Sequence, residues 1–489
     1  MATTLKPARP FPGTGSYPLD AGYYDEALAP TGTPRPPYAD VLDALARQDL
    51  VVLRERVRSN AATLGLDFGP GRPIAVDPVP RLFDGGAWEQ LEVGLVQRAR
   101  ALNAFLLDVY GEQRILAAGV VPRRLLETAS GYEPRMRGLL DPELPAATVA
   151  GLDLVRDPDG ELLVLEDNLR MPSGATYAFA VREAVAPEID AAARPRAIDG
   201  YTETLGAAIA AAAPAGVAEP AAAILSDGAE SGTYYEHRRF GRELDLPVLT
   251  PRQLELSRGR IYRRRGRRRE RIDVLYRRLD EDRLSTPDGD LTGLGELLLP
   301  ALESGRLRCV NAFGTGVADD KLAHAYVEEM VRFYLGEEPR LRSVPSFDLG
   351  DEASRRRALE RLDDLVLKPR DAFGGAGVTI MRRATSAQRR RAIGLLRRAP
   401  ERFVAQDTVA LSTHPTVCGG RLRPRHVDLR PFLVSSPAGT RAMAGGLTRY
   451  ARGAGEMVVN SSRGGGVKDT WIVDTAQAAE AGAEASGRR

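Results

Sequence analysis

Apolar residues recur with a helical period through the first quarter of the chain, from about residue 41 to 125. The residues before 41 carry Pro and Gly in clusters and show little periodicity. The pattern therefore predicts an extended N-terminal arm over 1–40 and a helical region after it. Its best example is the segment 87–111. One face of that segment carries a stripe formed by Leu91, Leu95, Ala99, Leu102, Leu106 and Val109.

The pattern changes near residue 148, where two apolar runs flank Asp157-Pro158-Asp159-Gly160. Such a turn between apolar runs predicts a β-hairpin over 148–168. Ser173 follows at a position that suits the N-cap of a helix. That helix would lead into the Ala-rich stretch 192–222, where we expect a helix and a linker.

Strand-like and helix-like segments alternate between residues 221 and 311, which favours an open α/β domain. From 318 onward we expect a helix, then a strand, a Gly-rich loop and a strand within 365–380, a helix over 385–400, and further strands. The tail is expected to fray. The chain thus divides into a helical region with a hairpin over 41–190, an Ala-rich linker over 191–220, an α/β domain over 221–317, a second lobe over 318–475 and a tail over 476–489.

The composition is that of an ordinary globular protein, with 43% apolar and 27% charged residues. A net charge of +2 gives no global electrostatic reason to bind nucleic acid or membranes. No apolar stretch approaches the ~20 residues of a membrane span, and the N-terminus lacks the pattern of a secretory signal. We expect a soluble cytoplasmic protein with no nucleic-acid or membrane partner; nothing in the sequence defines its oligomeric state.

The cysteines, an arginine-rich segment and the few lysines are local features of the sequence. Cys309 and Cys418 lie far apart and are expected to be reduced structural thiols. The arginine run 263–269 lacks interleaved aromatic residues and sits between two strand-like segments, so we expect a solvated hairpin tip rather than a nucleic-acid site. Lysine is rare, since 64 of the 68 basic residues are arginine. Because a compact ammonium suits a tight phosphate pocket better than a planar guanidinium, each lysine is a candidate binding residue.

The hairpin carries the sharpest candidate site. Glu166 and Asn168 are two residues apart on a strand, so their side chains project from the same face. Asp153 lies on the partner strand within cross-strand reach. Oxygen ligands on rigid strands suit Mg²⁺, which proteins usually hold with one or two carboxylates plus phosphates and waters. A solvated hairpin face is the alternative.

Two lysines lie in sequence patterns that are compatible with phosphate binding. Lys368 ends an apolar strand before a loop that contains Gly374, Gly375 and Gly377, whose backbone N–H groups could cradle phosphate oxygens. A plain Gly-rich turn is the alternative. Lys321 follows two acids at a helix start, where the acids could instead serve only the helix dipole.

Late in the chain, polar residues lie on or near expected strands. Arg425, Arg430 and Arg449 could stabilise charge in phosphoryl transfer, or could be surface cations. Asn460, the glycines after it and Lys468 form either another phosphate-facing loop or a flexible exit.

These motifs resemble those of ATP-grasp ligases, but in a different order. The Asp and Glu-x-Asn motif that closes the usual series here comes first, some two hundred residues before Lys368. The sequence therefore resembles the circularly permuted ATP-grasp type 2 family, related to the ligase domain of glutathionylspermidine synthase. The resemblance implies an α/β (α+β) fold with a pre-ATP-grasp α/β domain and an N-terminal helical region. Its motifs include VLEDNLRMPSG, SGTYYEH, IDVLYRRLDED, NAFGTGVADDK, ALSTHPT, RHVDLRP and NSSRGGGVKDTW.

The resemblance also implies roles for individual residues. It implies that magnesium is held by Asp153, Glu166 and Asn168. It implies that ATP contacts Lys321, Lys368, the loop with Gly374, Gly375 and Gly377, and a hinge made of Val404, Gln406 and Asp407. The catalytic residues would be Arg430, Arg449 and Asn460.

Two positions depart from the family pattern. The hinge reads Gln-Asp where Gln-Glu is more common, which bears on the contact with ribose. Gly151 stands where many unpermuted ligases have an arginine, so one transition-state cation is unassigned, with Arg156 and Arg170 as candidates.

The implied function is an ATP- and Mg²⁺-dependent carboxylate–amine ligase that works through an acyl phosphate and releases ADP. Ser173 and Gly174, at a helix N-terminus, would hold the substrate carboxylate or the acyl phosphate. Tyr235 and His237 would line the acceptor side, or else belong to core or surface. The alternative from another class is a catalytically silent protein in which ATP gates the binding of a partner.

Overall fold

The computed structural model describes residues 17–69, 71–266, 268–279, 283–371, 376–457, 459 and 464–474. Gly374, Gly375, Asn460 and the expected tail over 476–489 lie outside these residues. No helix within the described ranges is both long enough and apolar enough to cross a membrane.

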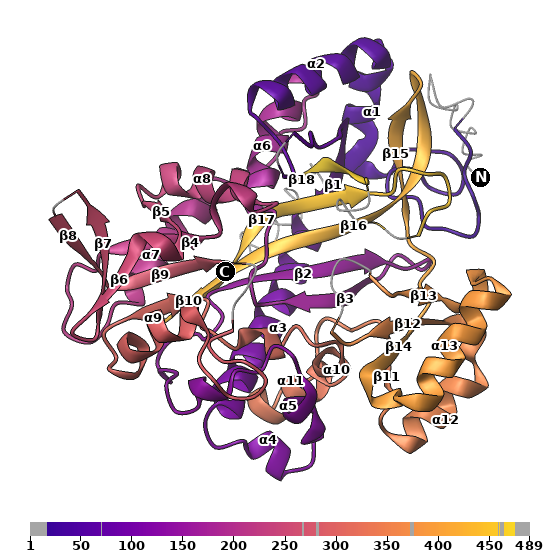
Figure 1. The fold of residues 1–489 in the computed structure, drawn as a ribbon. Coiled ribbons are helices and arrows are strands. Elements are labelled where there is room, and N and C mark those ends of the chain that lie inside the picture. The colour runs from indigo at the N-terminus through magenta and orange to yellow at the C-terminus, as the bar shows by residue number, and fades with distance from the viewer. Residues whose placement is uncertain are drawn as a thin grey trace, which may run out of the picture.

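A seven-stranded sheet forms the centre of the molecule (Figure 1). Its strand order is β1-β18-β17-β16-β2-β3, and β15 also pairs with β16. The early hairpin and the late strands are therefore neighbours in one sheet, because β2 pairs antiparallel with β16. The strands are β1 (Val76–Asp84), β2 (Val149–Arg156), β3 (Leu162–Asn168), β15 (Thr413–Cys418), β16 (Arg421–Ser436), β17 (Gly439–Tyr450) and β18 (Gly466–Val473).

The edge strand β1 contradicts the prediction that residues 41–125 are helical throughout. It lies parallel to β18, and its register shifts between Asp77 and Arg81. Pro78 and Pro80 lie within that stretch and lack backbone N–H groups, which confines such a strand to an edge or a bulge. The segment also lacks a period-two pattern, so it gave no strand signal.

Helices cover both faces of the central sheet. Adjacent residues on β1 point to opposite sides: Phe83 joins the core around α3 (Gly85–Val109), and Leu82 joins the core around α6 (Ala175–Val185) and α2 (Leu50–Thr63). The carboxylate of Asp84 accepts hydrogen bonds from the first turn of α3 and so caps it. The apolar stripe predicted within 87–111 is buried along α3. The smaller N-terminal helices are α1 (Ala39–Ala46), α4 (Arg114–Ala117) and α5 (Arg124–Thr128).

Residues 222–310 contain a parallel four-stranded sheet in the order β10-β9-β4-β5, with helices beside it. A separate antiparallel sheet, β6-β7-β8, holds the arginine run. There Glu255 pairs with Arg264 and Arg269, and Glu270 pairs with Arg263. The elements are α7 (Gly200–Ala211), β4 (Ala222–Ser226), α8 (Tyr234–Glu243), β5 (Val248–Leu249), β6 (Leu254–Ser257), β7 (Arg260–Arg265), β8 (Arg268–Ile272), β9 (Val274–Arg278), α9 (Gly293–Glu303) and β10 (Arg308–Val310).

A fourth sheet, in the order β11-β14-β12-β13, lies at the lower right of Figure 1 with α12 and α13 beside it. It has its own small core, which includes Leu365, Leu367 and Ala405. The helix expected after residue 318 is interrupted and forms two short helices, α10 and α11. The elements are α10 (Lys321–His324), α11 (Val327–Leu335), β11 (Ser346–Asp348), α12 (Glu352–Glu360), β12 (Leu365–Pro369), β13 (Thr379–Ile380), α13 (Ser386–Arg398) and β14 (Phe403–Asp407).

Candidate functional site

A cavity of about 470 Å³ lies between the central sheet and the sheet β11-β14-β12-β13, with Arg278 at the end of β9 also on its wall. Its wall includes residues of β2 and β3, residues of β12, β14, β16 and β17, and residues of the segments between strands and of helices. The early and late motifs of the sequence therefore face one space. Of the residues singled out in the sequence, the cavity is lined by Asp153, Glu166, Asn168, Ser173, Gly174, His237, Lys321, Lys368, Gln406, Asp407, Arg430 and Arg449.

The hairpin brings its two acids directly opposite each other. Asp153 pairs with Glu166, whereas the next pair joins Leu154 to Val164. Leu165 is thus an extra residue on β3, a β-bulge, and its side chain lines the cavity as well. Bulges often lie beside active sites, where they re-aim a side chain.

Asp153 is bound by two arginines from the late strands. Its carboxylate accepts hydrogen bonds from Arg430 Nε (2.5 Å) and Nη2 (2.7 Å) and from Arg449 Nη2 (2.9 Å). Burial alone would raise the pKa of Asp153, but the two guanidinium groups outweigh it and lower the pKa to about 2. Asp153 is therefore an anion at neutral pH.

Asp428 is a cavity residue that the sequence reasoning missed. Its carboxylate accepts hydrogen bonds from Arg449 Nε (2.8 Å) and Nη2 (2.6 Å). Burial raises its pKa, against the attraction of Arg449. Arg449 thus lies between Asp153 and Asp428, and Arg430 lies on the far side of Asp153. The spacing in the sequence could have identified Asp428, because Asp428 and Arg430 are two residues apart on a strand and therefore share a face.

Lys368 lies deep in the wall of the cavity. Its Nζ lies 3.7 Å from Glu166 Oε1. Burial lowers the pKa of Lys368, and the charge of Glu166 opposes that shift. Lys368 and Glu166, which are about two hundred residues apart in the sequence, therefore lie next to each other on the cavity wall.

The acids before Lys321 have structural partners of their own. Asp320 caps α10 through Leu322 N and is also bound by Arg370. Asp319 Oδ1 accepts hydrogen bonds from the backbone N–H groups of Leu169 (2.6 Å) and Arg170 (3.0 Å), just after β3. These contacts hold the start of α10 against the end of β3, with Lys321 on the cavity wall.

Two of the three expected hinge residues, Gln406 and Asp407, have different surroundings. Gln406 is almost fully buried, and its Nε2 donates to Leu165 O (3.3 Å) and Ser346 Oγ (3.1 Å), so its amide ties β14 to β3. Asp407 forms an ion pair with Arg361 at 3.1 Å. Burial raises the pKa of Asp407, while Arg361 opposes the shift.

The structure gives a reason for glycine at position 151. A Cβ at Gly151 would lie 2.9 Å from Pro172 Cβ and 3.3 Å from Arg430 Cδ, so the Arg430 side chain passes over this position. No side chain fits there without displacing one of them. Of the two arginines proposed as substitutes, Arg170 lines the cavity, whereas Arg156 pairs with Glu26 outside the cavity wall.

We expect Gly151→Ala to lower the free energy of unfolding by about 1–3 kcal/mol, because it overpacks this contact. Urea denaturation would measure the change. Gly200→Ala is the matched control, since a Cβ at Gly200 meets nothing within 4 Å. Equal stability of the two variants would contradict the close approach of Arg430 to Gly151.

The expected cap of α6 is wrong. Ser173 does not cap this helix, whose N-cap residue is Gly174 with a φ of 126°. The carboxylate of Glu236 takes that place and accepts hydrogen bonds from Gly174 N (2.9 Å) and Thr176 N (3.2 Å). Arg278 then binds Glu236 at 2.6 Å and Pro172 O at 2.7 Å. Glu236 therefore occupies the backbone N–H groups of Gly174 and Thr176. Ser173 and Gly174 still line the cavity, so their substrate role stays a prediction.

Tyr235 and His237 have mainly structural surroundings. His237 contacts Ser226 Oγ at 2.7 Å and Thr233 Oγ1 at 3.1 Å, and burial, helped by Arg278, lowers its pKa to about 2. It is neutral at physiological pH, and its low pKa makes it a weak base. Tyr235 is absent from the cavity wall and packs on Tyr177.

Other candidates lie away from the cavity wall or beside it. Lys468 is fully buried in β18, where it binds Asp77 and donates to Pro415 O at 3.0 Å, so it belongs to neither a loop nor a phosphate site. Arg425 donates to the carbonyl groups of Pro424 and Arg452. Gly377 has a φ of 69°, and a Cβ there would lie 2.8 Å from Pro369 Cγ.

The donor groups fit a hard cation that is only partly held by protein. Asp153, Glu166 and Asn168 supply carboxylate and amide oxygens on one wall. The amide nitrogen of Asn168 is buried and has no hydrogen-bond partner among the described residues, so other protein groups do not fix this amide through it. In the part of the chain that the structure describes, no three His, Cys, Asp or Glu residues gather as a metal site. A cation here would need further oxygen ligands, such as phosphates.

Comparisons with known proteins agree with this arrangement. The family model for circularly permuted ATP-grasp type 2 matches residues 80–451. A solved structure, a glutathione synthetase-like effector from Globodera pallida in its apo form, superposes with a TM-score of 0.54 at 12% identity, covering 87% of this chain and 98% of that chain. This likeness supports the fold.

Relatives match along nearly the whole chain. A protein of Frankia casuarinae, provisionally named glutamate–cysteine ligase 2-2, is 41% identical over 92% of this chain, but the match covers 53% of that relative, so this chain spans about half its length. An uncharacterized protein of Synechocystis sp. is 36% identical, and the match covers 92% of this chain and 97% of the relative. The resemblance seen in the motifs is thus confirmed, and the chain belongs to the circularly permuted ATP-grasp type 2 family.

Proposed function

We propose that the protein is an ATP- and Mg²⁺-dependent ligase that joins a carboxylate to an amine through an acyl phosphate. One observation carries this proposal. Asp153, Glu166 and Asn168 line the same cavity as Lys321, Lys368, Arg430 and Arg449. Oxygen ligands for a cation therefore face a set of cations suited to a triphosphate.

Each group has a place in this proposal. Glu166 and Asn168, with Asp153, would hold Mg²⁺, which when bound neutralises charge between the β- and γ-phosphates. Lys321 and Lys368 would bind phosphate oxygens. Arg430 and Arg449 would offset charge on the transferred phosphoryl group, and Asp428 would orient Arg449 through its two hydrogen bonds.

The reaction needs no nucleophile from the protein. A substrate carboxylate oxygen attacks the γ-phosphorus, the bond to the β–γ bridging oxygen breaks, and ADP leaves. An amine then attacks the acyl carbon and loses a proton, and inorganic phosphate leaves with the former carboxylate oxygen. The work of the protein is to position these groups and to supply a fixed electrostatic environment.

The relatives do not define the substrates. The name glutamate–cysteine ligase belongs to a protein of which this chain spans about half, so the activity behind that name can reside in the other half. We therefore propose the reaction class alone, with small-molecule or peptide substrates. Since the reaction consumes ATP, we place it in the cytoplasm.

The acyl phosphate can be tested with isotope labelling. Candidate carboxylic acids labelled with ¹⁸O are incubated with an amine mixture, ATP and Mg²⁺, and both ADP and the released phosphate are measured. We expect ADP release that depends on both substrates, and one ¹⁸O atom in the phosphate. ADP release with unlabelled phosphate would refute the acyl phosphate. Tight binding of Mg·ATP with no turnover on any pair, together with retention of a specific protein, would favour the nucleotide-gated binding protein instead.

A further inference from the structure

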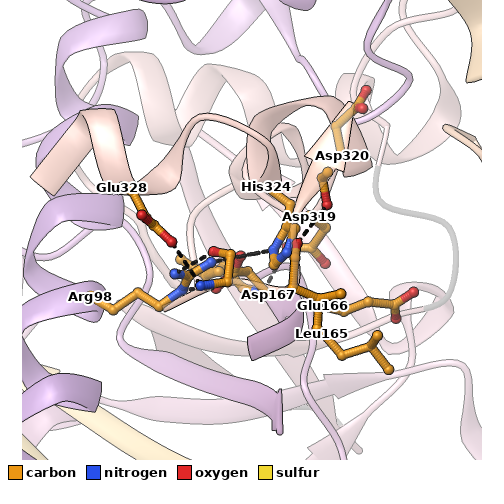
Figure 2. A network of polar contacts seen from close by, with 12 residues as sticks. Arg98, Leu165, Glu166, Asp167, Asp319, Asp320, His324 and Glu328 are labelled. Atoms are coloured by element: carbon orange, nitrogen blue, oxygen red, sulfur yellow. Dashed lines mark hydrogen bonds and ion pairs between the residues drawn. The ribbon is translucent and has the colours of Figure 1, made fainter. Parts of the chain in front are cut away.

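Asp167 lies between two proposed metal ligands but faces the other way. In Figure 2, Asp167 points toward Arg98 and His324, whereas the side chain of Glu166 extends in the opposite direction. This follows from strand geometry, since successive side chains alternate between faces. All three residues border the cavity, but the carboxylate of Asp167 is directed to Arg98 of helix α3 on the other side of the sheet.

The contacts of Asp167 are short and numerous. Its two oxygens accept hydrogen bonds from Arg98 Nε (2.6 Å) and Nη2 (2.8 Å), a bidentate pair. Oδ2 also lies 2.7 Å from Nδ1 of His324. All three side chains are buried. The carboxylate of Asp167 is thus held from two directions at once.

These three residues come from three separate segments. Arg98 belongs to α3, Asp167 to β3, and His324 closes the short helix α10 that begins with Lys321. Arg98 also donates to Ser343 Oγ at 3.0 Å, and Ser343 N donates to Glu328 at 2.8 Å. The network therefore joins β3, which carries the proposed metal ligands, to the helix that carries a proposed phosphate-binding lysine.

Burial and neighbouring charges shift the pKa values of both Asp167 and His324. Burial alone would raise the pKa of Asp167, but Arg98 and His324 outweigh it and lower the pKa. Burial lowers the pKa of His324, against the attraction of Asp167. Because a carboxylate oxygen can only accept, Nδ1 of His324 donates its proton to Asp167 Oδ2. Its Nε2 is buried without a hydrogen-bond partner among the described residues.

The network also forms the back of the candidate site. A second, small cavity of about 10 Å³ is bordered by His324 and Asp167 on one side. Glu166, Lys321 and Lys368 border it as well. A shift of His324 or Asp167 would therefore be passed to the groups proposed to bind Mg·ATP through direct packing.

Burying a carboxylate and a guanidinium is costly, and well-packed apolar residues often stabilise a fold equally well. Here the hydrogen bonds to Asp167 also fix the direction in which α3 and α10 meet β3. We propose that Asp167 is a positioning residue that, with Arg98 and His324, sets the spacing between Glu166 and Asn168 on β3 and Lys321 on α10. This proposal rests on the proposed function, because the spacing matters only if these groups share one Mg·ATP.

The test compares nucleotide binding with and without magnesium. Asp167→Asn keeps the size of the side chain but removes its charge. We expect it to weaken Mg·ATP binding by about 10- to 100-fold, as for other residues that orient metal ligands. We expect a smaller change for ATP in EDTA, where the contacts through magnesium are absent. Isothermal titration calorimetry measures both dissociation constants.

His324 offers a second, milder pair of variants. His324→Asn retains an N–H donor near the position of Nδ1, whereas His324→Leu removes it. We expect Mg·ATP to bind His324→Asn more tightly than His324→Leu. A role in stability alone would lower the melting temperature of both without separating their magnesium-dependent affinities. This pair also keeps the proposal testable if Asp167→Asn does not fold.

Asp469→Asn is the matched control. Asp469 is equally buried, is bound by Arg182 at 2.7 Å, and lies outside both cavity walls. We expect it to lose stability and to keep the wild-type affinity for Mg·ATP. Wild-type affinity in Asp167→Asn and in both His324 variants would overturn the positioning role. No Mg·ATP binding by the wild-type protein would overturn the proposed function itself, which is a different result.

Discussion

Glu166→Gln should lower the rate of ADP formation by about 100- to 1,000-fold, the loss expected when one preorganised charged group leaves an active site. The substitution keeps the size of the side chain but removes the charge that faces both the proposed cation and Lys368, whose Nζ lies 3.7 Å away. Because the glutamate side chain is partly exposed in the cavity, the fold should tolerate the amide. Coupled detection of ADP over a range of Mg²⁺ concentrations measures the effect.

Glu161→Gln is the control for this prediction. Glu161 lies on the same hairpin next to its turn, is largely exposed, and is outside the cavity wall. Its rate of ADP formation should equal that of the wild-type protein. If Glu166→Gln also kept the wild-type rate and the wild-type dependence on Mg²⁺, the hairpin would not be the metal site.

Arg449→Met should be the most destabilising substitution in the cavity. It leaves Asp153 with one partner and Asp428 with none of its arginine hydrogen bonds, although both carboxylates are buried. Breaking a buried ion pair from one side costs about 3–5 kcal/mol. Urea denaturation at pH 7.5 would measure the loss. Asp428→Asn removes the carboxylate charge that Arg449→Met leaves without its arginine. The double variant should therefore recover part of the lost stability.

The stability lost in Arg449→Met should also depend on pH. Without Arg449, burial and the neighbouring Asp153 should raise the pKa of Asp428 further above that of the unfolded chain. The folded variant then binds more protons than the unfolded one, so its stability falls as pH rises through that range. The deficit relative to wild type should be larger at pH 8 than at pH 5. A deficit independent of pH would show that Arg449 contributes packing rather than charge.

The sequence was most informative where local pattern determines geometry. The period-two alternation placed Glu166 and Asn168 on one face, and the turn at Asp157–Gly160 placed Asp153 on the partner strand. The structure has these strands and this turn, with Asp153 directly opposite Glu166. The permuted order of the motifs also led to the family, which the match over residues 80–451 confirms.

The features that sequence reasoning missed depend on contacts between distant segments. Ser173 suited a cap by local rules, but Glu236, some sixty residues later, occupies the helix end. Lys468 was expected in a loop, but pairing of β18 with β1 buries it beside Asp77. Asp428 and Asp167 lie within the motifs RHVDLRP and VLEDNLRMPSG, but the sequence does not show their contacts, because their partners Arg449 and Arg98 come from another strand and from a helix.

The pairing of β2 with β16 affects how the protein folds while the ribosome synthesises it. The edge of β2 that will receive β16 stays bare until residues 421–436 have been made. At typical translation rates that interval lasts roughly 15 to 60 seconds. Bare strand edges invite pairing with other chains. The nascent N-terminal half should therefore depend on chaperones until its C-terminal strands emerge.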